Sequence, residues 1–207
     1  MYLRVTAFKS EPGKLDEGIA FLKNKIIPSL SKAPGYLGTT CIVDRDKSEG
    51  AASTIWESLE AMNNAEQLAQ QARAQSSEAT GMEVIDVDRF EITLLEMASP
   101  TPQVPSYSRL ITAYGDPKKT DKVTEMIRKD APKIKQQPGF RSFSAGVNRA
   151  TGRGFTVSSW ATAAEREASD KALASTRQPV ADAGAMYGLQ VQNFETVIAE
   201  IKLPVRA

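Results

Sequence analysis

The chain of 207 residues contains two copies of one sequence pattern. When it is aligned with itself at an offset of 104 residues, Trp56 falls on Trp160 and Pro34-Gly35 falls on Pro138-Gly139. Further identical pairs follow in the same ungapped register: Pro28 and Pro132, Val43 and Val147, Arg45 and Arg149, Arg73 and Arg177, Met82 and Met186, Phe90-Glu91 and Phe194-Glu195. Average residue usage gives about four matches by chance over such a span. The sequence therefore predicts an internal duplication.

A stretch rich in Pro and Ser separates the two copies. ASPTPQVPS, residues 98–106, is typical of a stiff, extended linker. Each copy is about 100 residues long, which is a common domain size. We therefore predict two domains, residues 1–101 and 102–207.

Both copies predict the same order of elements. The β-rich segments 3–8 and 108–114 precede apolar residues at helical spacing in 14–32 and 118–137. Two strands, a helix and a last strand then follow: 36–44, 52–58, 59–75 and 84–95 in the first copy, and 140–148, 155–162, 163–176 and 189–200 in the second. Pro34-Gly35 and Pro138-Gly139 end the first helices, and Ser58 and Thr162 are candidate N-caps. The order β-α-β-β-α-β is the ferredoxin-like arrangement.

Helices cover one face of such a sheet and leave the other face bare. An antiparallel sheet that is apolar on both faces must bury the second face, and a duplicated chain carries its own partner. The predicted fold class is α+β, with two ferredoxin-like (βαββαβ) halves packed face to face as an internal dimeric α+β barrel. Two whole chains could also associate as a homodimer in addition to this internal pseudo-dimer.

The register changes near the start of each copy. TAF in the first copy resembles TAY in the second at an offset of 106, so the first copy has two more residues before its first helix. This register aligns Leu3 with Arg109, and the offset of 104 aligns Leu37 with Arg141. On this alignment only the second copy has a guanidinium at the two strand positions.

The absence of His and the presence of a single Cys exclude many kinds of functional site. The chain has no His and one Cys, so it lacks the residues for a Ser-His-Asp or Cys-His nucleophile, a His-ligated metal or haem, or a disulfide within the chain. We expect no metal, no cofactor and a reducing, cytoplasmic setting. The start of the chain lacks a signal-peptide pattern, and no apolar run approaches the roughly 20 residues that span a bilayer, so no membrane partner is expected. Basic residues are mixed with acidic ones, which argues against nucleic acid.

The segments PGYLGTTCIVDRD…STIWESLEAM and PGFRSFSAGVNRA…TVSSWATAAE resemble the antibiotic biosynthesis monooxygenase (ABM) type of dimeric α+β barrel proteins. The resemblance covers nearly the whole chain, once per half. It implies a family that includes cofactor-independent oxygenases acting on polycyclic phenols and haem-degrading enzymes. Many members carry a His nine residues after the Trp, where this chain has Ala65 and Ser169, and this disfavours haem degradation. In the family a Glu follows the Trp. The first half has this residue as Glu57, whereas the second half has Ala161 in its place.

Five residues are candidates for lining a ligand pocket, and no catalytic residue is assigned: Trp56, Arg109, Tyr114, Arg141 and Trp160. The Trp rings can stack on a planar ligand or can be core residues. The two Arg side chains can bind an anionic or enolic oxygen by paired hydrogen bonds, or can place their charges in water. Tyr114 can serve as a proton donor or be a residue at the edge of the core. If one pocket is functional, we expect it in the second half, beside Trp160, Arg109 and Arg141.

Two functions are compatible with these residues. One is a cofactor-independent monooxygenase-like protein that acts on a small aromatic or quinone-type substrate, with Arg and Tyr donors stabilising oxyanion charge. The other is a non-catalytic small-ligand-binding or scaffold module of the same fold. A cavity of roughly a few hundred cubic ångströms in either half, lined by convergent polar groups, would favour the first.

Overall fold

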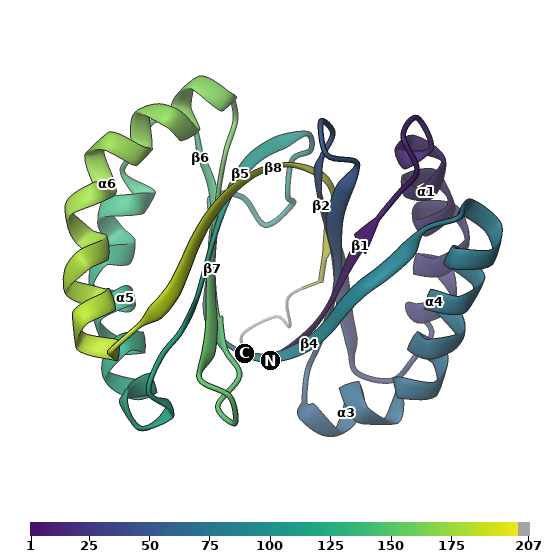
Figure 1. The fold of residues 1–207 in the computed structure, drawn as a ribbon, viewed down its shortest axis with the longest axis horizontal. Helices are drawn as coiled ribbons and strands as arrows, with labels where there is room; N and C mark the ends of the chain where they lie inside the picture. Colours follow the sequence, from purple (N-terminus) through teal and green to yellow (C-terminus); the bar gives the residue numbers. More distant parts are fainter. Residues whose placement is uncertain (203–207) are drawn as a thin grey trace. The chain divides into compact units, whose positions relative to one another are not determined.

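The computed structural model describes residues 1–202, which form two compact units. Unit 1 comprises residues 1–89 and 195–202, and unit 2 comprises residues 90–194. Each unit combines an antiparallel sheet with helices that lie along one face of that sheet (Figure 1). The α+β class predicted from the sequence is therefore confirmed.

Unit 1 contains the elements of the first copy in the expected order. They are β1 (Tyr2–Lys9), α1 (Leu15–Phe21), η1 (Leu22–Ile26), α2 (Ile27–Leu30), β2 (Tyr36–Asp44), β3 (Glu49–Trp56), α3 (Leu59–Asn64), α4 (Glu66–Thr80) and the start of β4 (Glu83–Met97). Strand β3 lies between β1 and β2 and is antiparallel to both. The helical segment from α1 to α2 continues through one π-helical turn, η1.

Unit 2 repeats this order. Its elements are β5 (Ser106–Tyr114), η2 (Pro117–Lys119), α5 (Thr120–Lys135), β6 (Phe140–Val147), β7 (Arg153–Trp160), α6 (Ala163–Gly184) and the start of β8 (Tyr187–Ile201). Strand β7 lies between β5 and β6, as β3 does in unit 1. Both halves are thus ferredoxin-like, as predicted, and the face-to-face packing of the two halves stays a prediction.

The last strand of each copy ends in the other unit. Residues 91–97 of β4 pair with β6 in unit 2, and residues 195–201 of β8 pair with β2 in unit 1. Strands of 15 residues extend about 50 Å, which is long enough to pair in two places. The packing units therefore differ from the sequence halves 1–101 and 102–207, because a strand is assigned by its hydrogen-bonded neighbours and not by its copy.

The local signals for turns and helix starts agree with the structure. Gly35 and Gly139 have φ angles of 75° and 69°, the left-handed region that favours glycine. The hydroxyl of Ser58 accepts a hydrogen bond from the N–H of Ala61. Thr162 and Glu165 form a reciprocal capping box at the start of α6.

The two caps predict different losses of stability. Thr162→Ala is expected to lower the free energy of unfolding by about 1–2 kcal/mol, because it removes the hydroxyl that accepts from the N–H of Glu165 and donates to the Glu165 carboxylate. Ser58→Ala is expected to cost about 1 kcal/mol, since a single cap bond is lost. Urea unfolding followed by circular dichroism measures both values. A smaller loss for Thr162→Ala than for Ser58→Ala would contradict this account.

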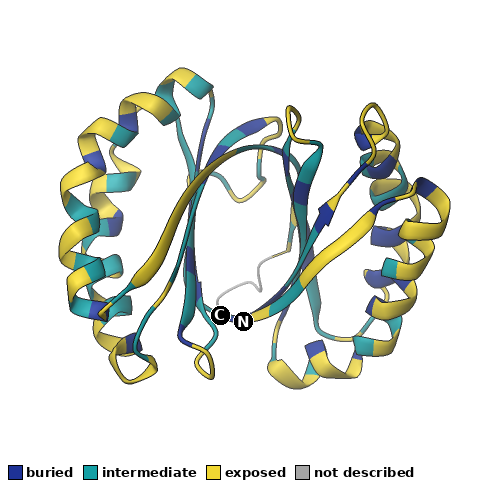
Figure 2. Cartoon of the chain, in the orientation of Figure 1, coloured by how far each residue is buried: buried dark blue, intermediate teal, exposed yellow. Residues whose placement is uncertain are grey.

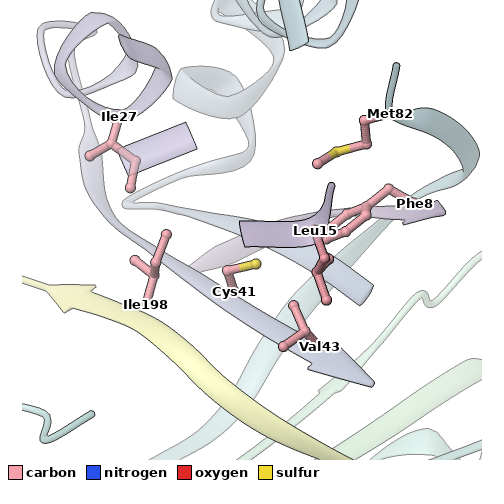
Figure 3. Packing of buried hydrophobic residues seen from close by; sticks show 7 residues of the cluster. All are labelled: Phe8, Leu15, Ile27, Cys41, Val43, Met82 and Ile198. Atoms are coloured by element: carbon pink, nitrogen blue, oxygen red, sulfur yellow. The ribbon is translucent and has the colours of Figure 1, made fainter. Parts of the chain in front are cut away.

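The core of unit 1 lies between its sheet and its helices. The buried cluster drawn in Figure 3 combines residues of the strands with residues of the helical segment 15–30, and its members are Phe8, Leu15, Ile27, Cys41, Val43, Met82 and Ile198. Burial raises the pKa of the Cys41 thiol to about 12, so this thiol stays protonated. Exposed residues lie along the helices on the side turned away from the sheet in each unit (Figure 2). This pattern is that of amphipathic helices packed on a sheet.

Candidate functional site

The strand register of the structure corrects the alignment of the two copies. Tyr2 pairs with Trp56 and Tyr107 pairs with Trp160, so the first strands of the copies are related by an offset of 105, not 106. The counterpart of Arg109 is therefore Arg4 and not Leu3. A buried Arg is common to both halves, and the expectation that only the second half carries it was wrong.

The residue that the first copy has in excess lies inside its first helix. Asp16 and Asp121 occupy equivalent positions at the offset of 105, since they bind Arg45 and Arg149 respectively. Between them and the prolines aligned at an offset of 104, the first copy has one extra residue. The π-helical turn η1 (Leu22–Ile26) accommodates it, because an i→i+5 turn holds one residue more than an α-turn. The prediction of two extra residues before the helix was wrong.

In unit 2 the buried Arg109 connects strand β5 with helix α6. The side chain is 4% exposed, and its guanidinium carbon lies 5.2 Å from the ring centroid of Trp160. Nη1 donates to Ser169 Oγ at 3.2 Å, Nη2 donates to the carbonyl oxygen of Arg166, and Nε pairs with Asp170 Oδ1 at 3.3 Å. Burial lowers the pKa of Arg109, and the charge of Asp170 opposes that effect. Every nitrogen of this guanidinium thus has a protein partner.

Arg4 makes the equivalent connection in unit 1. It is 2% exposed, lies 5.8 Å from the ring centroid of Trp56, and pairs with Glu66 Oε2 at 2.8 Å. Glu66 also accepts hydrogen bonds from Arg73 at 2.9 Å and from Arg89 at 2.7 Å. Burial raises the pKa of Glu66, but the hydrogen bonds from Arg89 and Arg73 outweigh it and lower the pKa to about 2. The carboxylate therefore stays ionised.

Both halves thus contain one arrangement of Trp, Arg, acid and a second Arg. In unit 2 the acid is Asp170, which binds Arg177, at an offset of 104 from Glu66 and Arg73. Sequence reasoning missed the pair of acids, although the coincidence of Arg73 with Arg177 was a signal for it. A repeated ion-paired cluster is first of all a means of positioning each helix on its sheet.

A cavity lies between the sheet and helices α5 and α6 of unit 2. Its volume is about 160 Å³, and the cavity at the corresponding place in unit 1 has about 70 Å³. The walls of the larger cavity are mostly apolar and include Ile111, Val123, Ile127, Phe143, Phe155 and Leu173. Only residues of unit 2 line it among those that the structure describes.

One substitution between the copies explains much of the difference in volume. Phe8 pairs with Gly50 in unit 1, and Ala113 pairs with Gly154 at the equivalent place in unit 2. The Phe8 ring is buried in the core cluster, whereas Ala113 lines the cavity. The second copy therefore lacks the ring that fills this space in the first.

One part of the wall of the cavity of unit 2, here called its polar end, is formed by Arg109 and Ser158, which are partners in the pairing of β5 with β7. Trp160, two residues after Ser158 on the same face of β7, has a buried Nε1 with no hydrogen-bond partner among the described residues. In unit 1 the corresponding Trp56 Nε1 donates to Thr54 Oγ1 at 3.0 Å. Unit 2 thus has one buried donor without a partner within residues 1–202, although Trp160 is not among the residues that line the cavity.

The other three candidate residues lie away from this cavity. Tyr114 is 38% exposed and stacks on Tyr187, with ring centroids 5.7 Å apart. Trp56 is in the core of unit 1, where it packs with Met62. Arg141 lies at the β-bulge of β6, and its Nη1 is buried without a partner within residues 1–202. Of the five candidates, the structure brings Arg109 and Trp160 together.

The described residues contain neither a metal site nor a helix that could span a membrane. Within residues 1–202, no group of three His, Cys, Asp or Glu side chains lies close enough to hold a metal ion. No helix in the described part of the chain is long and apolar enough to cross a bilayer.

Comparisons with known sequences find matches for the first copy and for the whole chain. Residues 1–77 match the family model "Antibiotic biosynthesis monooxygenase". The uncharacterized protein Rv2558 of Mycobacterium tuberculosis is 36% identical over 62 residues, which are 30% of this chain and 26% of that protein, so the match spans about a quarter of its length. The uncharacterized protein Rv2557 of the same organism is 25% identical over 207 residues, 99% of this chain and 91% of that protein.

Solved structures share the fold of the chain. An "anthrone oxidase-like protein" is 15% identical with a TM-score of 0.69, covering 100% of this chain and 97% of that one. A "Putative monooxygenase" from Fusobacterium nucleatum is 12% identical with a TM-score of 0.71, covering 97% and 94%. A "ferredoxin fold protein related to antibiotic biosynthesis monooxygenases" from Listeria monocytogenes is 8% identical with a TM-score of 0.57, covering 93% of each chain. At these identities the likeness shows the fold alone.

Proposed function

We propose that this protein, whose residues 1–77 match the antibiotic biosynthesis monooxygenase family model, acts as a cofactor-independent monooxygenase-like protein on a small aromatic or quinone-type substrate. The observation that carries the proposal is the cavity of unit 2, which is apolar along its walls and has Arg109 and Ser158 at one end. Such a combination suits a ring that carries an oxygen substituent.

The volume of the cavity limits the size of the substrate. An apolar cavity of about 150 Å³ is known to admit benzene, and the cavity of unit 2 has about 160 Å³. A single substituted ring therefore fits. The anthrone oxidase-like neighbour supports an aromatic substrate class, while the volume favours a smaller ring system.

The reaction needs an electron-rich substrate, since the proposal assigns no cofactor. A phenol that loses its proton becomes a phenolate, which can transfer electrons to dioxygen directly. The ring carbon then gains one oxygen atom and loses its hydrogen, the phenol becomes a quinone, and the second oxygen atom leaves as water. Atoms balance with one dioxygen consumed per phenol.

The residues at the polar end have distinct parts in this proposal. The charge of Arg109, which lines the cavity, stabilises the phenolate. Ser158 contributes a hydroxyl at the same end. The apolar walls keep water away from the reactive ring.

Filling the cavity tests the proposal. Ala113→Phe introduces the residue that the first copy has at the equivalent position, and it is expected to lower substrate-dependent oxygen uptake more than tenfold. Oxygen consumption with a panel of single-ring hydroquinones and phenols is the measurement. Phe8→Leu, at the matched position of unit 1, should leave oxygen uptake unchanged. Equal uptake by wild type and Ala113→Phe would show that the reaction takes place elsewhere or not at all.

A binding module without catalysis is the second candidate function. Every guanidinium nitrogen of Arg109 already has a protein partner, and this favours a structural role over a reactive one. If the protein is such a binding module, single-ring phenols should raise the unfolding temperature of the wild type but not of Ala113→Phe, and no oxygen should be consumed.

A further inference from the structure

Unit 1 contains more buried guanidinium donors than acceptors. Nε and Nη1 of Arg4, and Nη1 of Arg73, are buried and have no hydrogen-bond partner within residues 1–202. Arg4 is 2% exposed, so water at the surface does not reach it. Buried polar groups in native proteins nearly always have a partner, which indicates that a bound molecule supplies one here.

Both arginines line the smaller cavity. Its volume is about 70 Å³, several times what one water molecule needs. Thr6, Thr39 and Thr54 also line this cavity and add hydroxyl groups to its wall. The rest of the lining is mostly apolar, as in the cavity of unit 2, so the two cations and the hydroxyls form one polar part of the wall, which is suited to a polar group of an occupant.

The second copy shows how the same Arg is satisfied when the protein supplies the acceptor. In unit 2, Arg109 Nη1 donates to Ser169 Oγ at 3.2 Å. The equivalent residue in unit 1 is Ala65, which has no side-chain acceptor. The unpaired Nη1 of Arg4 is thus the direct result of one difference between the copies.

The net positive charge around this cavity favours an anion over a water molecule as its occupant. Arg4, Arg73 and Arg89 all pair with Glu66, so one carboxylate faces three guanidinium groups. The strong ionisation of Glu66 leaves an excess of two positive charges in this cluster. A water molecule would satisfy donors but would leave that excess, whereas a monovalent anion reduces it.

We propose that the cavity of unit 1 binds one small planar oxyanion of the formate, bicarbonate or nitrate type, held by Arg4 and Arg73. The planar fork of a guanidinium matches two oxygens of such an anion. The volume of the cavity suits three or four heavy atoms. This site lies in the other unit from the cavity of the proposed function, so either can fail without the other.

Thermal unfolding of the full chain in sodium formate tests the proposal, with ionic strength held constant by sodium chloride. Saturable stabilisation is expected, with an increase in midpoint of about 5 °C when formate is one hundred times its Kd. Sodium nitrate should raise the midpoint as formate does. Chloride should raise it less, because a single spherical ion does not offer two oxygens to the guanidinium fork. Equal midpoints in formate and in chloride at the same ionic strength would overturn the proposal.

Variants decide whether the effect arises in this cavity. Ala65→Ser introduces the acceptor of the second copy and is expected to weaken formate binding at least tenfold, with no loss of stability in the absence of formate. Arg73→Met is expected to weaken it by a similar factor. Arg45→Met, which removes an exposed guanidinium of unit 1, is the control and should keep the wild-type response. A full response in both Ala65→Ser and Arg73→Met would place the anion elsewhere and refute the site.

Discussion

Replacing Phe8 with Ala is expected to lower the free energy of unfolding by about 3–5 kcal/mol. Phe8 is 1% exposed and lies in the core cluster of unit 1 with Leu15 and Met82 (Figure 3). Gly50 on the paired strand leaves the room that the ring occupies, because a Cβ there would be 2.7 Å from the ring. Truncation therefore leaves a cavity that the strands can close only in part.

Urea unfolding measures this loss, and thermal unfolding should show a midpoint about 10 °C lower for a chain of this length. Tyr114→Ala is the matched control, since it removes an exposed aromatic ring and should cost less than about 1 kcal/mol. A loss below about 1 kcal/mol for Phe8→Ala would mean that unit 1 repacks around the smaller residue. The two cavities would then not differ because of Phe8 and Ala113.

Arg109→Leu is expected to lower the free energy of unfolding by about 2–4 kcal/mol. The variant loses packing on Trp160. It also loses the hydrogen bonds that Arg109 donates to Ser169 and to the carbonyl of Arg166, although this carbonyl keeps Ser169 Oγ as a donor. This expected loss of stability is smaller than the loss on breaking a fully buried ion pair, because Asp170 is 45% exposed and keeps Arg177 as a partner.

Arg141→Leu is the control for this variant, because it introduces the aligned residue of the first copy at a half-buried position. It should change the free energy of unfolding by less than about 1 kcal/mol. Urea unfolding of both variants under identical conditions gives the comparison. If Arg109→Leu is as stable as Arg141→Leu, the buried guanidinium does not hold α6 on the sheet, and a role in ligand binding alone would remain.

The sequence by itself determined the duplication, the order of elements and the places where helices begin and end. The duplication is a comparison of the sequence with itself, and the helix ends depend on contacts between residues that are neighbours in the sequence. Gly139 adopts a left-handed conformation that other residues avoid, and Thr162 satisfies the free N–H groups at the start of its own helix. Such signals can be read without knowing what the element packs against.

The alignment of the two first strands shows where sequence reasoning failed. Similarity of three residues favoured an offset of 106, whereas the pairing of β5 with β7 gives 105. Because neighbouring side chains of a strand point to opposite faces, an error of one residue assigned Arg109 to the face of Leu3 and concealed its likeness to Arg4. The same error concealed the difference between Phe8 and Ala113.

Only the tertiary structure decided which strands are neighbours and where space remains. The ends of β4 and β8 pair outside their own copies, since hydrogen bonding between strands depends on partners distant in sequence. The unpaired donors of Arg4 and Trp160, and the unequal cavities of the two units, arise from side chains of several elements meeting at one place. A sequence fixes each of those side chains, but packing decides which donors find a partner and which volumes stay open.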